Sequence, residues 1–337
     1  MKKDIIISGS RSTTPWTGKK DANPLQSFLD RIVEETYESK HKKIQDSPAE
    51  IELLNQYEPR QCGHCSSTKF IRYGTTRAGI TRYKCKSCGR TFNILTGTIF
   101  QDHKISITEW MDYCLGLFRH ESFNSIAKSN RNSFTTTKYW LHKIFAILED
   151  YQNDIVLGGD VYIDEMCYKV RKPDIIYKEG NKELRGQSVN QMVIAIGFDG
   201  NRVIANYQGK CKTSIARTKK SYMDHIAKGS TLIHDKEKCH GALVKDLELN
   251  SIAYNGNALK KIKDEDNPLD PINKQCLRLR QFLDSHAGFI RDDIDGYLNL
   301  FCFMMNEGES PYEKVEKLLY RAIYFPKTLS YRDVFCK

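Results

Sequence analysis

The chain has 337 residues, more than one typical domain needs, which predicts two or three folded units. Lysine and arginine exceed aspartate and glutamate by 52 − 42 = 10, and seven basic residues but no acidic ones lie between Cys62 and Phe92. No apolar stretch approaches the length that crosses a bilayer, and the first residues lack the apolar run of a signal peptide. The basic cluster favours a phosphate-backbone partner, with a surface that only serves solubility as the alternative.

Residues 1–57 are expected to form an N-terminal region that is partly helical and partly disordered. Two helices fit residues 25–57. The second begins with a capping box, in which Ser47 is the N-cap, Pro48 the first helical residue and Glu50 the third. The sequence does not indicate what this region does.

Four of the eleven cysteines form two Cys-x-x-Cys pairs, and nineteen residues separate the pairs. In a chain without a secretion signal, cysteines favour metal binding over disulfides. This spacing predicts a zinc ribbon over residues 58–95 with a structural Zn²⁺. The expected zinc ligands are Cys62, Cys65, Cys85 and Cys88. We expect the ribbon to bind nucleic acid because it has no acidic residue between Cys62 and Phe92, although ribbons also bind protein.

Residues 104–150 have helical periodicity throughout. Ser106 and Glu109 form a second capping box ahead of an apolar face. Two further helices, separated by the polar turn 130–133, predict a helix-turn-helix region that binds DNA. An ordinary helical hairpin fits the pattern equally well, and Trp140 is expected in the core rather than at DNA.

The pattern changes at residue 158 to strands that alternate with helices. The expected order is three antiparallel strands followed by helix, strand, helix, strand and helix. This is the order of an RNase H-like α/β domain, which we place at residues 158–306. A mobile basic loop is expected at 171–190 and a polar loop over the site at 256–269, and the tail 307–337 is left unassigned. The expected strands are 161–170, 191–198, 202–208, 231–235 and 251–255, and the expected helices are 237–248 and one from 271.

Asp164 lies within the first of these strands, between apolar residues that indicate burial. A buried carboxylate is costly unless it is paired or holds a metal. Asp235 ends the fourth strand and Asn273 opens the last helix, so both are expected to converge on Asp164. We expect this trio to bind two Mg²⁺ or Mn²⁺ ions, as phosphodiester chemistry requires. A structural salt bridge of Asp164 is the alternative.

Two further positions compete for roles at this centre. Asp270 could replace Asn273 as third ligand, but its place before Pro271 favours an N-cap. Arg280 lies two helical turns beyond Asn273, on the same face, where it could contact a DNA phosphate. Glu165 alternates to the other face of the strand and is not expected to be a ligand.

These residues resemble a known family. The four-cysteine ribbon and the segments VYIDE, TLIHDK, INKQCLRLRQFLDSHAGF and YLNLFCFMMN resemble zinc-ribbon insertion-sequence transposases of the DDE superfamily. The similarity is to the group whose third catalytic residue is Asn followed by a basic residue, and it covers roughly residues 60–305. It implies that Asp164, Asp235, Asn273 and Arg280 are catalytic. The family usually has Lys in place of Arg280 and His in place of Cys276.

The resemblance implies a transposase that cleaves double-stranded DNA at inverted-repeat ends and joins it to target DNA. Joining two ends requires at least a dimer. A bacterial, cytoplasmic protein that associates with the nucleoid through DNA is expected, without membrane contact. The alternatives are a metal nuclease on the same fold and a non-catalytic DNA-binding regulator derived from a transposase.

Overall fold

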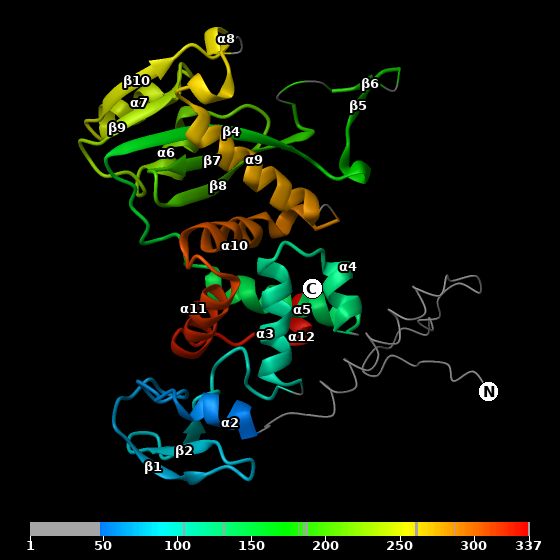
Figure 1. Ribbon diagram of the computed structural model, residues 1–337, viewed down its shortest axis with the longest axis vertical. Helices are drawn as coiled ribbons and strands as arrows, with labels where there is room; N and C mark the ends of the chain where they lie inside the picture. Colours follow the sequence, from blue (N-terminus) through cyan, green and yellow to red (C-terminus); the bar gives the residue numbers. More distant parts are fainter. Residues whose placement is uncertain are drawn as a thin grey trace, which may run out of the picture. The chain divides into compact units, whose positions relative to one another are not determined.

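The computed structural model describes residues 48–335 apart from positions 104, 131, 181, 185, 187, 260, 261 and 287 (Figure 1). It has two compact units. The first contains the described residues up to Ile147 and those from Gly308 onward, and the second spans Leu148–Glu307. Ser47 and the first helix expected in 25–57 lie outside the described residues. Among the helices that the structure describes, none is both long enough and apolar enough to cross a membrane.

A three-stranded antiparallel sheet lies in the first unit. Its strands follow chain order: β1 (Phe70–Thr75), β2 (Thr81–Cys85) and β3 (Thr91–Asn93). The expected hairpin is confirmed, and β3 is an additional strand. Each strand places one aromatic side chain on the same face of the sheet. The ring centroids of Phe70, Tyr83 and Phe92 are 5.4–5.6 Å apart.

Helices make up the rest of the first unit. Ser106 accepts a hydrogen bond from the backbone N–H of Glu109, which confirms the predicted cap. Trp140 is 6% exposed and its ring centroid lies 5.4 Å from that of Tyr113, so it belongs to the core as expected. The helices are α2 (Pro48–Asn55), α3 (Ile107–Phe118), α4 (Phe123–Ser129), α5 (Phe134–Leu148), α11 (Pro311–Tyr324) and α12 (Tyr331–Phe335).

The second unit contains a five-stranded mixed sheet in the order β10-β9-β4-β7-β8. Strands β4, β7 and β8 are antiparallel neighbours, while β9 is parallel to both β4 and β10. The predicted order of elements is therefore confirmed. The strands are β4 (Asp160–Lys169), β7 (Gln191–Phe198), β8 (Val203–Lys210), β9 (Thr231–Asp235) and β10 (Asn250–Tyr254).

Helices α6 (Ile215–Tyr222), α7 (His240–Asp246), α9 (Asp270–Ser285) and α10 (Ile294–Asn306) pack around this sheet (Figure 1). Helix α9 packs on β4 and β7, and α10 packs on β8. Helix α6 packs on β7, β8 and α7. The central strand β4 is thus covered by α9 along the length where Asp164 lies.

Two segments expected as loops contain short elements. A two-stranded sheet, β5 (Tyr177–Lys178) with β6 (Lys182–Glu183), and a 3-10 helix at Lys172–Asp174 lie within 171–190. Helix α8 (Gly256–Leu259) and a 3-10 helix at Asp264–Asp266 lie within 256–269. The first segment is ordered by side chains that polarity alone does not reveal: Asn190 exchanges two 2.8 Å hydrogen bonds with the backbone of Ile176.

Candidate metal centres and nucleic-acid surface

The four predicted zinc ligands form one cluster. The Sγ atoms of Cys62 and Cys88 are 3.9 Å apart, those of Cys65 and Cys85 are 3.6 Å apart, and all four lie within 4.8 Å of one another. Tetrahedral Zn²⁺ with Zn–S bonds of about 2.3 Å places its sulfurs about 3.8 Å apart, so the cluster fits the ion.

Backbone N–H groups point at the sulfur atoms of Cys85 and Cys62. The N–H of Cys88 lies 3.5 Å from the Cys85 sulfur, and this hydrogen bond lowers the pKa of Cys85 to about 6. The N–H of His64 lies 3.4 Å from the Cys62 sulfur. Gly63 is needed in the first pair because a Cβ there would lie 2.5 Å from the backbone oxygen of Thr96.

The other face of the ribbon sheet is exposed. Strand pairing sets Ile71 opposite Lys84, on the face away from the aromatic cluster. Tyr73 is 50% exposed, and its ring centroid lies 5.2 Å from Lys84 Nζ and 6.0 Å from Arg82 Cζ. We name Ile71, Tyr73, Arg82 and Lys84 the outer ribbon face. An exposed aromatic ring between two cations suits base stacking and phosphate pairing.

Asp164 is a largely buried carboxylate on the central strand. Its Oδ1 accepts the backbone N–H of Glu165 at 2.8 Å, and the Cys276 thiol donates to its Oδ2 at 3.7 Å. No ion pair joins it to a cation among the residues that the structure describes. Burial raises the pKa of Asp164 to about 6, and the negative charges of Glu165 and Asp235 add to this effect.

Asp235 lies beside Asp164 at the end of the adjacent parallel strand. The register pairs Tyr162 with Ile233, two residues before each aspartate, so both side chains leave the sheet in the same direction. Asp235 Oδ1 accepts the backbone N–H of Glu237 at 3.3 Å. Because its charge helps to raise the pKa of Asp164, the two carboxylates interact.

One face of α9, which we call the α9 stripe, packs along β4. Cys276 contacts Asp164, Arg280 donates to the Cys167 carbonyl at 3.2 Å, and Asp284 accepts the Tyr168 hydroxyl at 3.0 Å. Asn273 is exposed and lies about one turn before Cys276 on the helix. Arg280 lies about one turn after Cys276.

Asp270 does not serve as the predicted N-cap. It is the first residue of α9, the cap position is Leu269, and no side chain caps this end. The Asp270 carboxylate instead forms an ion pair of 2.6 Å with Lys274, one turn further along. Pro271 favoured the N-cap interpretation because Pro is common at the first position of a helix. In the structure Pro271 is the second residue of α9, where Pro also fits.

A second group of ligand-type side chains lies beside Asp235, and the sequence interpretation missed it. His234 and His240 are 4% and 0% exposed, and with Asp235 they offer ligand atoms within 4.8 Å of one another. Glu165 lies 3.1 Å from His240 through both carboxylate oxygens, so it faces α7 rather than α9, as expected. The available signal was the pattern of His and Asp at the strand end, followed by His five residues later.

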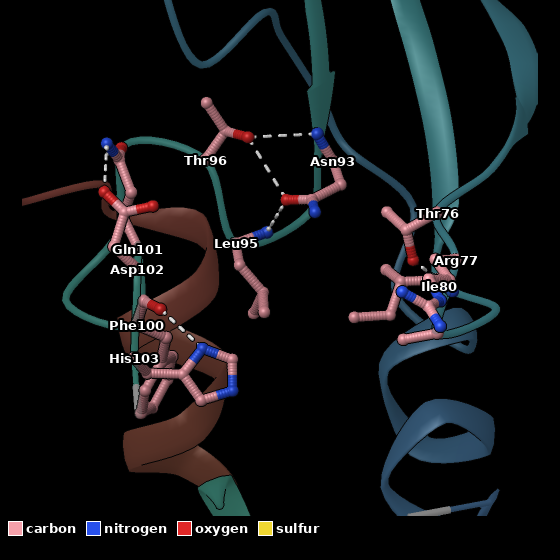
Figure 2. A pocket seen from close by; sticks show the side chains of 11 residues that line it. Thr76, Arg77, Ile80, Asn93, Leu95, Thr96, Phe100, Gln101, Asp102 and His103 are labelled. Atoms are coloured by element: carbon pink, nitrogen blue, oxygen red, sulfur yellow. Dashed lines mark hydrogen bonds between the residues drawn. The ribbon is translucent and has the colours of Figure 1, made fainter. Parts of the chain in front are cut away.

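A cavity of about 370 Å³ lies in the first unit (Figure 2). It opens between the turn that carries Thr76 and Arg77 and the segment from Asn93 to His103. The Asn93 amide oxygen accepts the Leu95 N–H at 3.0 Å and the Thr96 hydroxyl at 3.1 Å, so these polar groups serve the loop itself. None of the ligand-type clusters found in the described residues lines this cavity.

Comparisons with known proteins give short or distant similarities. No family model matches the chain. A stretch of 49 residues is 43% identical to an uncharacterised protein in transposable element ISH50 of Halobacterium salinarum; it covers 14% of this chain and 16% of that relative.

Three solved structures illustrate the structural similarity. The simian T-cell lymphotropic virus intasome gives a TM-score of 0.29 at 11% identity over 58% of this chain and 68% of that one. The Mos1 mariner paired-end complex with Mn gives a TM-score of 0.28 at 12% identity, over 60% of this chain and 72% of that one. The Drosophila P element transposase strand transfer complex gives a TM-score of 0.24 at 11% identity, over 66% of each chain. Scores this low do not establish a shared fold, so the description of the second unit rests on its own strand order.

Proposed function

We propose that this protein is a DNA transposase that cleaves the inverted-repeat ends of an insertion sequence and joins them to target DNA. The observation that carries the proposal is the pair Asp164 and Asp235, on adjacent parallel strands of a sheet with RNase H-like strand order. The similarity of a short segment to a protein of a transposable element agrees with it.

In this proposal Asp164, Asp235 and Asn273 supply the oxygen ligands for Mg²⁺ or Mn²⁺. Asp164 fits this role because its carboxylate is largely shielded from water and has no cation partner among the residues that the structure describes, so a bound cation would relieve the cost of its ionisation. When bound, the ions would activate the attacking oxygen and stabilise the leaving one. Arg280 lies on the exposed side of the α9 stripe and would hold a DNA phosphate beside the reacting one.

The ribbon and the helices of the first unit would bind the element ends. The four-cysteine cluster would hold structural Zn²⁺, and the outer ribbon face would contact DNA. Helices α4 and α5 would act as a helix-turn-helix. Because two ends must be joined in one complex, the active form would be at least a dimer.

The test uses full-length protein, DNA that carries the flanks of its own gene, and Mg²⁺ or Mn²⁺. We expect cleaved and joined products from the wild type and a loss of at least 100-fold for Asp164→Asn or Asp235→Asn. Asn273→Ala should reduce the rate, whereas the control Asp270→Asn should leave it nearly unchanged because Asp270 is paired with Lys274.

Three outcomes would replace the proposal. Cleavage without joined strands would identify a metal nuclease. Specific DNA binding by folded protein that never cleaves would identify a regulator. Cleavage that survives Asp164→Asn would show that the reacting metals lie elsewhere.

A further inference from the structure

Two buried histidines beside Asp235 face each other through the same type of nitrogen. His234 Nδ1 and His240 Nδ1 are 3.1 Å apart, and the rings meet edge to face with centroids 4.9 Å apart. Asp235 Oδ1 lies 3.4 Å from His240 Nδ1, and the Asp235 backbone oxygen contacts His234 Nδ1. Two nitrogens and two oxygens therefore surround one small volume.

The other nitrogen of each ring is held from outside. His240 Nε2 lies 3.1 Å from both oxygens of Glu165, and His234 Nε2 lies 3.1 Å from the Ser251 hydroxyl. A carboxylate accepts the Nε2 proton of a neutral imidazole and leaves the Nδ1 lone pair free. Metal-binding histidines are typically oriented in this way, with one nitrogen on the metal and the other on a carboxylate, hydroxyl or carbonyl.

The Asp235 backbone oxygen can only accept a hydrogen bond, so His234 Nδ1 carries a proton when no metal is bound, and a cation that binds between the two rings takes the place of this proton. Both rings are buried. The Asp235 side chain is 34% exposed, which leaves an open side for a further ligand such as water or a phosphate oxygen. Imidazole nitrogens with one carboxylate oxygen form a donor set for Zn²⁺, Mn²⁺, Co²⁺ or Fe²⁺ rather than for Mg²⁺.

We propose that His234, Asp235 and His240 bind one transition-metal ion, with Glu165 and Ser251 as the outer groups that orient the two imidazoles. The proposal concerns a site on the Asp235 side of the proposed catalytic centre, and it rests on the proposed function only in sharing Asp235. It implies that the protein prefers a transition metal over Mg²⁺ at this position.

A neighbouring cluster offers a different ligand set, made of Glu165, Cys239 and His240. In that arrangement His240 would bind metal through Nε2. However, this nitrogen is equally close to both Glu165 oxygens, which is the geometry of an N–H group shared by a carboxylate. Cys239→Ser is therefore the matched control, since it removes a ligand of the rejected set and none of the proposed one.

The test measures metal binding by the full chain without DNA. Protein equilibrated with Zn²⁺ and freed of excess metal should carry two Zn²⁺ per chain, one in the ribbon and one at the proposed site. His234→Gln and His240→Gln should each remove one equivalent, Cys65→Ser should remove the other, and Cys239→Ser should remove none. Co²⁺ absorption separates the sites, because only the ribbon gives thiolate charge-transfer bands.

Milder variants keep the test valid if a histidine variant fails to fold. Glu165→Gln and Ser251→Ala retain all three ligands and should weaken Zn²⁺ or Mn²⁺ binding by about 10- to 100-fold. Excess Mg²⁺ should not displace the second ion.

The proposal is wrong if the wild type carries one Zn²⁺ per chain and folded His234→Gln protein carries the same amount. In that case a proton, and not a metal ion, lies between the rings. Loss of the second zinc in Cys239→Ser would favour the rejected ligand set. The result is independent of cleavage: two ions in a protein that never cuts DNA would support this site and defeat the proposed function.

Discussion

The buried Lys143 and the half-buried Asp164 differ in how the structure accommodates their charges. Lys143 is 8% exposed, and its Nζ donates to the Ile99 carbonyl at 2.6 Å and lies 4.7 Å from the centroid of the Tyr139 ring. These neutral partners satisfy one donor but do not balance the charge. Asp164 instead has a second carboxylate beside it, which makes its ionisation more costly. A carboxylate pair of this kind is explained by a cation, whereas Lys143 is explained by local structure.

Burial lowers the pKa of Lys143 to about 8 from 10.5, so its native state binds fewer protons than the unfolded state between these values. The stability of the wild type should therefore rise with pH over this window. Lys143→Met removes the titration, and the difference in free energy of unfolding between variant and wild type should change by about 2 kcal/mol between pH 7.5 and 9.5. Urea unfolding at both pH values measures this difference in free energy. A difference that stays the same at both pH values would show that the pKa of Lys143 is not lowered in the folded state.

At the scale of elements, the ribbon depends on a close approach of two backbone segments. Gly63 and Gly97 face each other, and the Cβ that a residue other than glycine would add at position 97 would lie 2.9 Å from the Gly63 oxygen. Helix α2 contributes as well, since Asn55 Oδ1 accepts the Thr81 N–H at 2.9 Å. Backbone and side-chain contacts therefore shape the ribbon in addition to its four-cysteine cluster.

Gly63→Ala should disrupt the ribbon because its Cβ would lie 2.5 Å from a backbone atom that no side-chain rotation can move away. We expect at least a tenfold faster loss of Zn²⁺ to a chelator. The matched control is Gly89→Ala, which has φ of +73° but nothing within 4 Å of the added carbon, and should cost only about 1 kcal/mol. Equal zinc retention by Gly63→Ala and the wild type would mean that the Gly63–Thr96 contact is not required.

At the scale of the whole molecule, the net charge of +10 is unevenly placed along the chain. The seven basic residues between Cys62 and Phe92 belong to the first unit, while the carboxylates proposed for catalysis belong to the second. If the protein binds DNA through the ribbon, substitutions of the ribbon's basic residues should weaken DNA binding, and substitutions of the carboxylates should abolish cleavage without weakening DNA binding.

DNA binding by Asp164→Asn protein, which should not cleave, provides the measurement. Adding Arg82→Gln and Lys84→Gln should reduce the slope of log K against log salt by about 2, because about one counterion is released per phosphate contact. Adding Tyr73→Ala should weaken binding by about 1–3 kcal/mol without changing the slope. Lys228→Gln with Lys245→Gln, two exposed lysines of the second unit, is the charge-matched control. An equal change of slope in the control would place the DNA contact outside the outer ribbon face.

Much of the local structure of this protein can be predicted from its sequence. Strands β7 and β9 and the N-cap of α3 follow from patterns of neighbouring residues, and Cys-x-x-Cys spacing indicated the four-cysteine cluster. Contacts between separate elements needed the folded molecule. The contact of Cys276 with Asp164 and the approach of His234 to His240 depend on how α9 and α7 pack on the sheet. Periodicity gives the face on which a side chain lies, but packing fixes its partner.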